Sequence, residues 1–316
     1  MHLYYTPQGA GNTTLKEISK IKKIKEEPFR LEGDIQTLFE NNLLEIMELI
    51  VVKREFTIED KRIDTLAYNE QTKAFTIIEF KRAKNISVID QGFTYLSLML
   101  KNKAEFIVEY NEQLKKNLQR KDIDWEQTRV AFVSQSFTDQ QIQALDFKDL
   151  PIELWKVTQY ESGIIAITTI AKSKTAPSIK KIIQEKEETK AIANEIKVYT
   201  EEDHLANISE EIVELYEKFK AAIVTLIDGV EIKPQKHYIS FKKGGNVVDI
   251  AIRKSSLVLW INSKKDTIND FKGISRNVAG LGHQGNGDYE INIKDDRELE
   301  YIMSLIKQHL IAKNLI

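Results

Sequence analysis

The chain contains no cysteine among its 316 residues. This absence excludes disulfide frameworks, zinc ribbons and thiol nucleophiles, and it agrees with a reducing compartment. Long apolar runs are missing too, because the longest stretches, such as Leu257–Ile261, fall far short of the roughly 18–20 residues that a membrane span needs. The N-terminus lacks the basic segment and apolar run of a secretory signal. We therefore expect a cytoplasmic protein that does not enter a membrane.

The chain also has little net charge. Its 46 Lys and Arg residues nearly balance 48 Asp and Glu residues, which leaves a formal charge of −2 at pH 7. A protein that binds nucleic acid through its overall field would be more basic. Any nucleic-acid function must therefore depend on local patches. The 42% hydrophobic and 30% charged residues are typical of a folded chain, long enough for two domains.

Hydrophobic periodicity divides the first 170 residues into the helices and strands of an α/β unit. Apolar residues at every third position predict a short helix over 15–27 that ends at Pro28. A stripe at helical spacing predicts a long helix over 31–50. The remaining predicted elements are strands at 53–57, 62–68 and 73–81, a helix at 88–101, a strand at 129–134, a helix at 139–145, and strands at 152–160 and 163–170.

The composition changes after residue 171, where a stretch rich in Lys, Glu, Ser and Pro predicts a charged linker or helical arm over 172–206. A smaller domain is expected over 207–316. Its predicted elements are helices at 209–227 and 297–311 and strands at 237–241, 247–252, 256–261 and 289–293. Basic residues around these strands either contact nucleic acid or a partner, or form an ordinary solvated surface (Lys233, Lys236, Lys242, Lys243, Arg253 and Lys254).

The most informative motif is an Asp on one predicted strand followed by Glu-x-Lys on the next. Alternate residues of a strand face the same side, so Glu79 and Lys81 project together, and Asp64 on the neighbouring hairpin strand can approach Glu79. Two carboxylates and an ammonium in one cleft are what metal-assisted phosphodiester cleavage needs. The alternative is an ion pair between Glu79 and Lys81 at the edge of an exposed strand.

The wider pattern resembles the PD-(D/E)xK nuclease signature, and over about residues 28–110 it resembles the nuclease domain of the NucS/EndoMS mismatch endonucleases. The matching segments are Leu31–Gln36, Arg54–Phe56, Arg62–Asp64, Glu79–Arg82, Gln91 and Tyr95–Leu96. This resemblance implies a restriction-endonuclease-like mixed sheet flanked by helices over residues 1–171. Those endonucleases carry an N-terminal DNA-binding domain, whereas only about 28 residues precede the first nuclease helix here, so mismatch recognition is not expected to transfer.

The same resemblance implies the roles of individual residues. Asp64, Glu79 and the carbonyl of Phe80 would hold Mg²⁺ or Mn²⁺, and Lys81 would be the catalytic lysine. Glu32 would be an outer carboxylate, with Glu40 as a rival for that role. The remaining residues in the implied site are Gln91, as a catalytic or positioning group, and the substrate contacts Tyr95, Arg62, Arg82 and Lys84. The alternative for Gln91 and Tyr95 is a polar spot beside the apolar stripe of their helix, and for Arg82 and Lys84 it is plain solvation.

The C-terminal region resembles an uncharacterised bacterial domain, domain of unknown function 5655, on the segment Leu281–Glu290, the strand Leu257–Ile261 and the closing helix. His283 and Asp288 form either a small polar site or part of a structural glycine loop. The expected fold class is α/β (α+β), with this smaller C-terminal α+β domain serving in targeting or assembly.

We therefore expect a Mg²⁺-dependent endonuclease that hydrolyses DNA, in restriction, defence or repair. The alternative is a module on a nuclease-like fold that binds nucleic acid or a protein without cleaving. A homodimer would place two clefts on one duplex.

Overall fold

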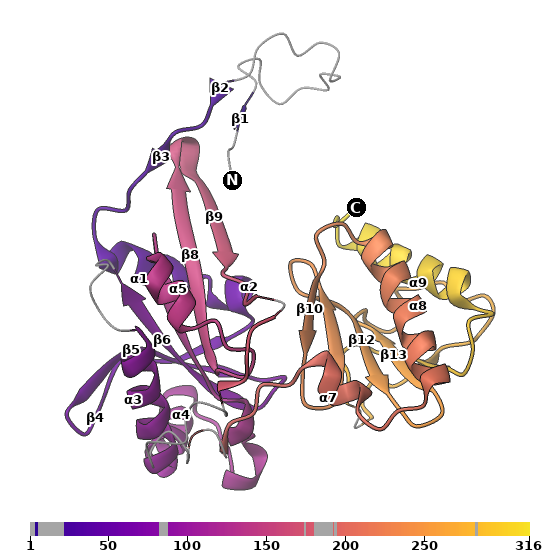
Figure 1. The fold of residues 1–316 in the computed structure, drawn as a ribbon, viewed down its shortest axis with the longest axis horizontal. Coiled ribbons are helices and arrows are strands. Elements are labelled where there is room, and N and C mark those ends of the chain that lie inside the picture. Colours follow the sequence, from indigo (N-terminus) through magenta and orange to yellow (C-terminus); the bar gives the residue numbers. More distant parts are fainter. Residues whose placement is uncertain are drawn as a thin grey trace.

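The computed structural model describes residues 4–5, 22–81, 88–173, 175–179, 192, 195–281 and 284–316. These residues form two large sheets with their own helices, which lie side by side in Figure 1, and a separate two-stranded pair. We call the first sheet and its helices the N-terminal unit, and the second sheet and its helices the C-terminal unit.

The sheet of the N-terminal unit is mixed, with strand order β3-β8-β7-β6-β5-β4 and β9 paired to β8. β4, β5 and β6 form an antiparallel meander, and β6, β7 and β8 run parallel. The strands are β3 (Glu26–Glu27), β4 (Ile50–Ile58), β5 (Lys61–Asn69), β6 (Ala74–Lys81), β7 (Arg129–Ser134), β8 (Ile152–Tyr160) and β9 (Ile164–Thr169). A separate pair joins β1 (Tyr4–Tyr5) to β2 (Lys22–Lys23).

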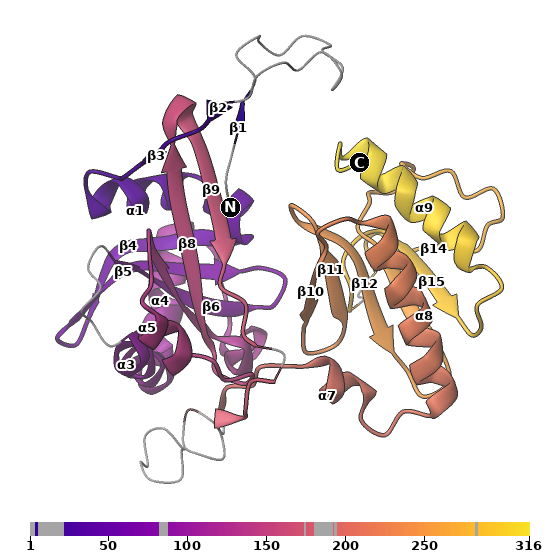
Figure 2. The same cartoon turned by 45° about the horizontal axis from the view of Figure 1, so that its top comes forward.

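Helices cover both faces of this sheet (Figure 2). α1 (Glu32–Asn41) and α2 (Leu43–Met47) pack over one face, where Ile35 and Phe39 meet Ile78 and Phe80. The other face is covered by α3 (Val88–Lys101), α4 (Lys103–Leu114) and α5 (Asp139–Ala144). The expected mixed sheet flanked by helices is therefore confirmed.

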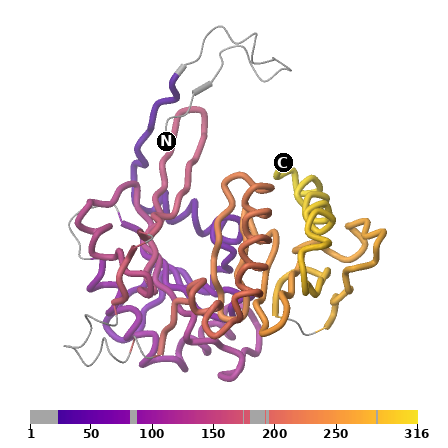
Figure 3. Tube along the Cα trace, turned by 45° about the vertical axis from the view of Figure 1, so that its right-hand side comes forward, coloured from indigo at the N-terminus to yellow at the C-terminus, as the bar shows by residue number. Residues whose placement is uncertain are grey.

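The C-terminal unit is a second, antiparallel sheet of order β10-β11-β12-β13-β15-β14. Its strands are β10 (Glu231–Pro234), β11 (Ile239–Lys242), β12 (Asn246–Ile252), β13 (Leu257–Ile261), β14 (Arg276–Asn277) and β15 (Tyr289–Ile293). After the short α7 (Glu201–Leu205), α8 (Glu210–Leu226) and α9 (Leu299–Ala312) pack together against the sheet, as the tube in Figure 3 also shows. The expected smaller α+β domain is confirmed as a fold.

Two of the expected helices differ from the structure. The described part of 15–27 is extended, because Glu26 and Glu27 pair with the protruding end of β8, and Lys25 exchanges hydrogen bonds with Glu161. The helix expected over 31–50 ends at Asn41, where the Asn42 side chain bonds the carbonyl of Leu38, and a short second helix follows. Ile50 already belongs to β4.

The stretch predicted as a charged linker also contributes to the first core. Ile179, Ile192 and Ile196 are buried and pack in the same hydrophobic cluster as the strands of the N-terminal unit. These described parts of 172–206 are therefore attached to the N-terminal unit. Of the helices that the structure describes, none has both the length and the apolar character needed to cross a membrane.

Candidate active site

The candidate site lies where β5 and β6 diverge, at the carboxyl end of β6. The register pairs Thr65 with Ile78, so the next residues along the two strands, Asp64 and Glu79, are neighbours. The Asp64 carboxylate also accepts a hydrogen bond from the main-chain N–H of Phe80, at 2.9 Å. The predicted hairpin thus brings the two acidic residues together.

A chain of polar contacts links Glu79 to α3. Lys81 Nζ and Gln91 Nε2 both donate to Glu79 Oε1, at 2.7 and 2.9 Å. Gln91 Nε2 also lies 3.0 Å from the Tyr95 hydroxyl, which donates to the carbonyl oxygen of Arg62 at 3.3 Å. Gln91 and Tyr95 are one helical turn apart, so they reach the strand from the same face of α3. The structure therefore brings together the side chains of Asp64, Glu79, Lys81, Gln91 and Tyr95.

Gly92 explains how α3 comes so close to the sheet. A Cβ at this position would lie 2.3 Å from the Cδ1 atom of Ile152 on β8. Only a residue without a side chain fits between the helix and this strand in the present packing. The neighbouring Gln91 is thereby held within hydrogen-bond distance of Glu79.

One oxygen of Glu79 is left without a partner. Glu79 is only 5% exposed, and its Oε2 atom is buried and makes no hydrogen bond with a described residue. Gln91 Oε1 is likewise buried and makes no hydrogen bond with a described residue. A buried carboxylate oxygen without a donor is unfavourable unless a cation or water satisfies it. This oxygen therefore fits a cation ligand better than a structural contact.

Charge repulsion and burial shape the acid–base behaviour of the site. Burial, followed by the negative charge of Glu79, raises the pKa of Asp64 to about 6, against the lowering effects of the Phe80 N–H and Lys81. Burial and the charge of Glu79 also raise the pKa of Tyr95. A carboxylate whose charge is disfavoured by a neighbouring carboxylate, as at Asp64, is a setting in which a bound cation is stabilising.

The structure separates the two candidates for the outer carboxylate. Glu40 is 8% exposed and already occupied, because Arg54 Nε lies 3.0 Å from its carboxylate and the Thr65 hydroxyl donates to it at 2.5 Å. Glu32 stands exposed at the start of α1, and its charge contributes to the raised pKa of Asp64. The two candidates therefore differ in their surroundings, and the outer-carboxylate role stays a prediction for either residue.

The remaining predicted residues lie around this cluster. Phe80 contributes its main chain, while its ring packs on Phe39 with centroids 5.8 Å apart. The Arg62 side chain is exposed and lies 3.6 Å from Glu55. Arg82 and Lys84 lie outside the described residues.

The described part of the chain contains no group of three His, Asp or Glu side chains placed to hold a metal ion. Asp64 and Glu79 supply two carboxylates, so a third protein ligand would have to come from the main chain. Hard oxygen donors of this kind suit Mg²⁺ or Mn²⁺, which commonly keep several water ligands. The buried Glu79 oxygen without a partner among the described residues and the raised pKa of Asp64 both suit a cation at this position, so the residues fit the ion.

Sequence reasoning assigned no role to Gln36, although the residue is part of the site. Its Nε2 atom donates to the main-chain oxygen of Asp64 at 3.3 Å and to Glu40 at 3.1 Å. The spacing of Gln36 and Glu40, one helical turn apart on α1, was the available signal. Gln36 connects α1 to the strand that carries Asp64.

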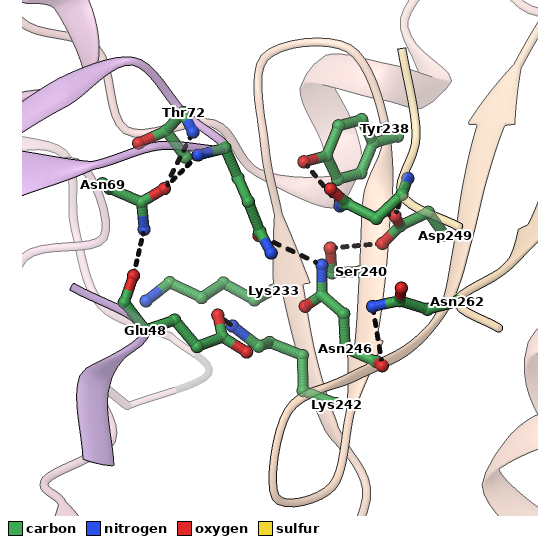
Figure 4. Close-up of polar contacts among 12 residues, drawn as sticks. Glu48, Asn69, Thr72, Lys233, Tyr238, Ser240, Lys242, Asn246, Asp249 and Asn262 are labelled. Atoms are coloured by element: carbon green, nitrogen blue, oxygen red, sulfur yellow. Dashed lines mark hydrogen bonds and ion pairs between the residues drawn. The ribbon is translucent and has the colours of Figure 1, made fainter. Parts of the chain in front are cut away.

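In the C-terminal unit, His283 lies outside the described residues. Asp288 accepts a hydrogen bond from the main-chain N–H of Lys265 at 2.7 Å, which is a structural contact. A different acid, Asp249, is fully buried and was not predicted (Figure 4). It accepts hydrogen bonds from the Ser240 hydroxyl at 2.6 Å and from the main-chain N–H and side-chain amide of Asn286 at 2.7 and 2.8 Å.

Comparison with known proteins identifies relatives but no activity. Residues 201–309 match the family model of domain of unknown function DUF5655, as the C-terminal motif indicated. An uncharacterized protein of Haemophilus influenzae is 52% identical over 289 residues, which are 92% of this chain and 96% of that protein.

Two solved structures are similar at a lower level. A repair endonuclease from Pyrococcus abyssi matches 42% of this chain and 49% of its own, with 16% identity and a TM-score of 0.24. Pyrococcus furiosus SfsA in complex with Ca²⁺ matches 47% of this chain and 75% of its own, with 14% identity and a TM-score of 0.24. TM-scores at this level support no argument, so the nuclease hypothesis depends on the site.

Proposed function

We propose that this chain, which belongs to the same protein family as the uncharacterized Haemophilus influenzae protein, is a metal-dependent nuclease that hydrolyses phosphodiester bonds in DNA. The observation that carries the proposal is the meeting of Asp64, Glu79 and Lys81 at the end of β6, with a buried Glu79 oxygen that no described residue satisfies. An edge ion pair alone would be exposed, whereas the Lys81 and Glu79 side chains are 13% and 7% exposed.

Asp64, Glu79 and the main-chain carbonyl of Phe80 would hold Mg²⁺ or Mn²⁺. Such an ion polarises a phosphoryl oxygen and lowers the pKa of a water molecule. Above pH 6 the Asp64 carboxylate would be available as a ligand, since its pKa is about 6.

The chain's own residues would supply orientation and charge. Lys81 holds an ammonium group beside Glu79, where it would stabilise the negative charge that develops on the scissile phosphate. Gln91 fixes Glu79 Oε1, and Tyr95 keeps its proton because its pKa is raised, so its hydroxyl continues to donate to the Arg62 carbonyl. Arg62, Arg82 and Lys84 are the proposed contacts to neighbouring phosphates.

Cleavage of defined DNA substrates tests the proposal. The purified chain is incubated with plasmid, single-stranded and branched DNA in Mg²⁺, Mn²⁺ or EDTA. We expect cleavage with the ions and none with EDTA, and a rate about 10²–10³-fold lower for Lys81→Ala. The matched control is Lys116→Ala, which removes a surface lysine paired with Glu70 and should cleave as the unaltered chain does.

Calorimetry with Mn²⁺ separates the proposal from its alternative. We expect Asp64→Asn to lose ion binding and Lys81→Ala to retain it, since the lysine is not a ligand. A chain that cleaves none of these substrates and binds no divalent ion would instead be a binding module. The presence of only two described carboxylates at the site favours that alternative over any other function.

A further inference from the structure

The contact between the two units is made of charged side chains. Three lysines of the C-terminal unit each reach a carboxylate of the N-terminal unit. The pairs are Lys233 with Glu153 at 3.5 Å, Lys236 with Asp124 and Glu126 at 3.0 Å each, and Lys242 with Glu48. The Asn246 amide also donates to the Gln71 side chain at 3.3 Å. Figure 4 shows Lys233 and Lys242 extending from the second sheet toward the loops of the first.

Apolar packing contributes little to this contact. The hydrophobic clusters of the described residues belong either to the N-terminal unit or to the C-terminal unit, and none of them spans both. A groove of about 710 Å³ lies between the units and is lined by charged, polar and apolar residues from both sides. Partly exposed ion pairs are individually weak and are screened by salt. The two units are therefore held together by a contact that another anion can replace.

Four lysines of the C-terminal unit lie at this contact or line the hollows beside it, and we call them the lysine face (Lys233, Lys236, Lys242 and Lys243). They come from β10, the following loop, β11 and the β11–β12 turn. Lys243 also lines the groove and makes no ion pair with a described residue. Lys243 thus gives the lysine face one positive charge that no described carboxylate pairs in the docked arrangement.

We propose that the lysine face is a binding surface for the phosphate backbone of nucleic acid, which the carboxylates of the N-terminal unit occupy in the docked arrangement. The choice of nucleic acid as partner rests on the proposed nuclease function. Carboxylates and phosphates compete for the same lysine ammonium groups. A polyanion has the advantage, because each phosphate contact releases condensed counterions while the intramolecular carboxylates release few.

The position of the contact is consistent with this use. The carboxylates that meet the lysine face lie between α2 and β4, before β7 and at the start of β8, and the β5–β6 turn contacts Asn246 beside the face. Glu79 and Lys81 stand at the other end of β6. Eight residues of strand separate the two ends by roughly 23 Å, at about 3.3 Å per residue. Docking therefore leaves the candidate active site uncovered and blocks the lysine face. Nucleic acid and the N-terminal carboxylates exclude each other from this face, so binding of DNA would release the C-terminal unit.

Binding is measured on the full chain in the Lys81→Ala background, so that no substrate is cut. Fluorescence anisotropy with labelled duplex and single-stranded DNA is recorded from low to high salt. Replacing all four lysines of the face by Ala should weaken binding at least tenfold at about 0.1 M salt and reduce the slope of log K against log salt by about 3–4. The matched control replaces four exposed lysines elsewhere on the same unit and should retain the affinity and slope (Lys218, Lys265, Lys272 and Lys307).

Removing the carboxylates that compete for the lysine face should strengthen DNA binding. The double variant Glu48→Gln with Glu126→Gln removes the carboxylate partner of Lys242 and one of the two carboxylate partners of Lys236. Its DNA affinity should therefore rise about threefold to tenfold. Because the chain lacks cysteine, Glu112→Cys and Glu300→Cys give two unique labelling sites on exposed positions of α4 and α9. Energy transfer between the labels should fall when DNA is added, and also when salt is raised.

The inference is wrong if the four-lysine variant binds DNA as tightly as its control, or if DNA leaves the energy transfer unchanged. Neither result depends on cleavage. A chain that binds DNA through the lysine face but never cuts it would support this inference and contradict the nuclease proposal. A chain that cuts DNA, but whose four-lysine variant binds DNA as tightly as its control, would support the nuclease proposal and contradict this inference.

Discussion

The carboxylate of Asp64 accepts a hydrogen bond from the main-chain N–H of Phe80 at 2.9 Å, across the open end of the β5–β6 hairpin. This contact fixes one carboxylate oxygen beside β6, one residue from Glu79. It also opposes the effect of burial and of Glu79 on the pKa of Asp64, which is nevertheless raised to about 6. Asp64 is therefore held in place in a setting that disfavours its charge, as a ligand residue would be.

The first prediction follows from this raised pKa. The folded chain binds the Asp64 proton more tightly than the unfolded chain, so this group's contribution to stability is present below pH 3.8 and is lost as pH rises to about 6. Asp64→Asn should consequently be more stable than the unaltered chain at pH 8 by about 1 kcal/mol, after allowance for solvent screening. Urea denaturation at pH 4 and pH 8, without divalent ions, measures the difference.

At pH 4 the extra stability of Asp64→Asn should disappear, because Asp64 is then protonated in the folded chain. Comparing the two chains at each pH removes the contribution of other titrating groups. An Asn variant that is less stable at pH 8 than the unaltered chain would show that the charge is already compensated by described residues.

The second prediction concerns the Lys81–Glu79 pair. Both side chains are largely buried and 2.7 Å apart, so removing the cation leaves the Glu79 carboxylate without its ion-pair partner beside Asp64. Lys81→Met, which keeps most of the aliphatic stem, should cost about 3 kcal/mol at pH 8. The cost should shrink toward pH 5, because protonation then relieves the repulsion. Lys61→Ala is the control, because its pair with Asp60 is exposed and screened by solvent, so its loss should leave stability nearly unchanged.

Much of the fold was predictable because its elements have strong local periodicity. The helix at 88–101 and the strand at 129–134 have the bounds that the apolar pattern predicted. The error at 15–27 has a physical cause, because pairing with β8 is a long-range contact that no local pattern reports. The break at Asn42 depends on one side-chain hydrogen bond to Leu38, which spacing alone does not reveal.

The site was predictable to the same extent. Strand alternation and hairpin pairing were enough to bring Asp64 close to Glu79, and helical spacing placed Gln91 with Tyr95. The occupation of Glu40 by Arg54 and Thr65 was not predictable, because it requires the packing of α1 against the sheet. The lysines of β10 and β11 could not be assigned for the same reason, since their partners lie 80 or more positions away in the sequence.

The third prediction tests the role of Gly92. A methyl group there would overlap Ile152 Cδ1, so Gly92→Ala should cost about 1–3 kcal/mol. Ile152→Val removes that Cδ1 atom, so the double variant should be more stable than the sum of the single changes predicts, with a coupling of at least about 1 kcal/mol. Thermal and urea unfolding of the four chains give the cycle.

Gly33 provides the matched control for this cycle. It lies near the start of α1, and a Cβ there would meet no atom within 4 Å. Gly33→Ala should therefore stabilise the chain by up to about 1 kcal/mol, through helix propensity alone. Additive effects in the Gly92 and Ile152 cycle would show that α3 shifts freely, and that Gly92 does not hold Gln91 against Glu79.

The last prediction concerns Asp249, which is fully buried in the C-terminal unit and whose pKa burial raises to about 6. Asp249→Ala leaves the Ser240 hydroxyl and two Asn286 donors without an acceptor, so it should cost at least about 3 kcal/mol. Asp249→Asn keeps an oxygen for Asn286 and turns its amide toward Ser240, whose hydroxyl can accept. The folded unaltered chain loses the stabilising proton of Asp249 as pH rises from 3.8 to about 6, whereas Asn does not titrate. The Asn variant should therefore be less stable than the unaltered chain at pH 4.5 and equally or more stable at pH 8. Urea unfolding followed by Trp260 fluorescence measures this crossover, and Asp266→Asn, at an 83% exposed side chain, should show none. If the Asn variant were as unstable as the Ala variant at both pH values, the ionised carboxylate itself would be what holds the Asn286 loop in place.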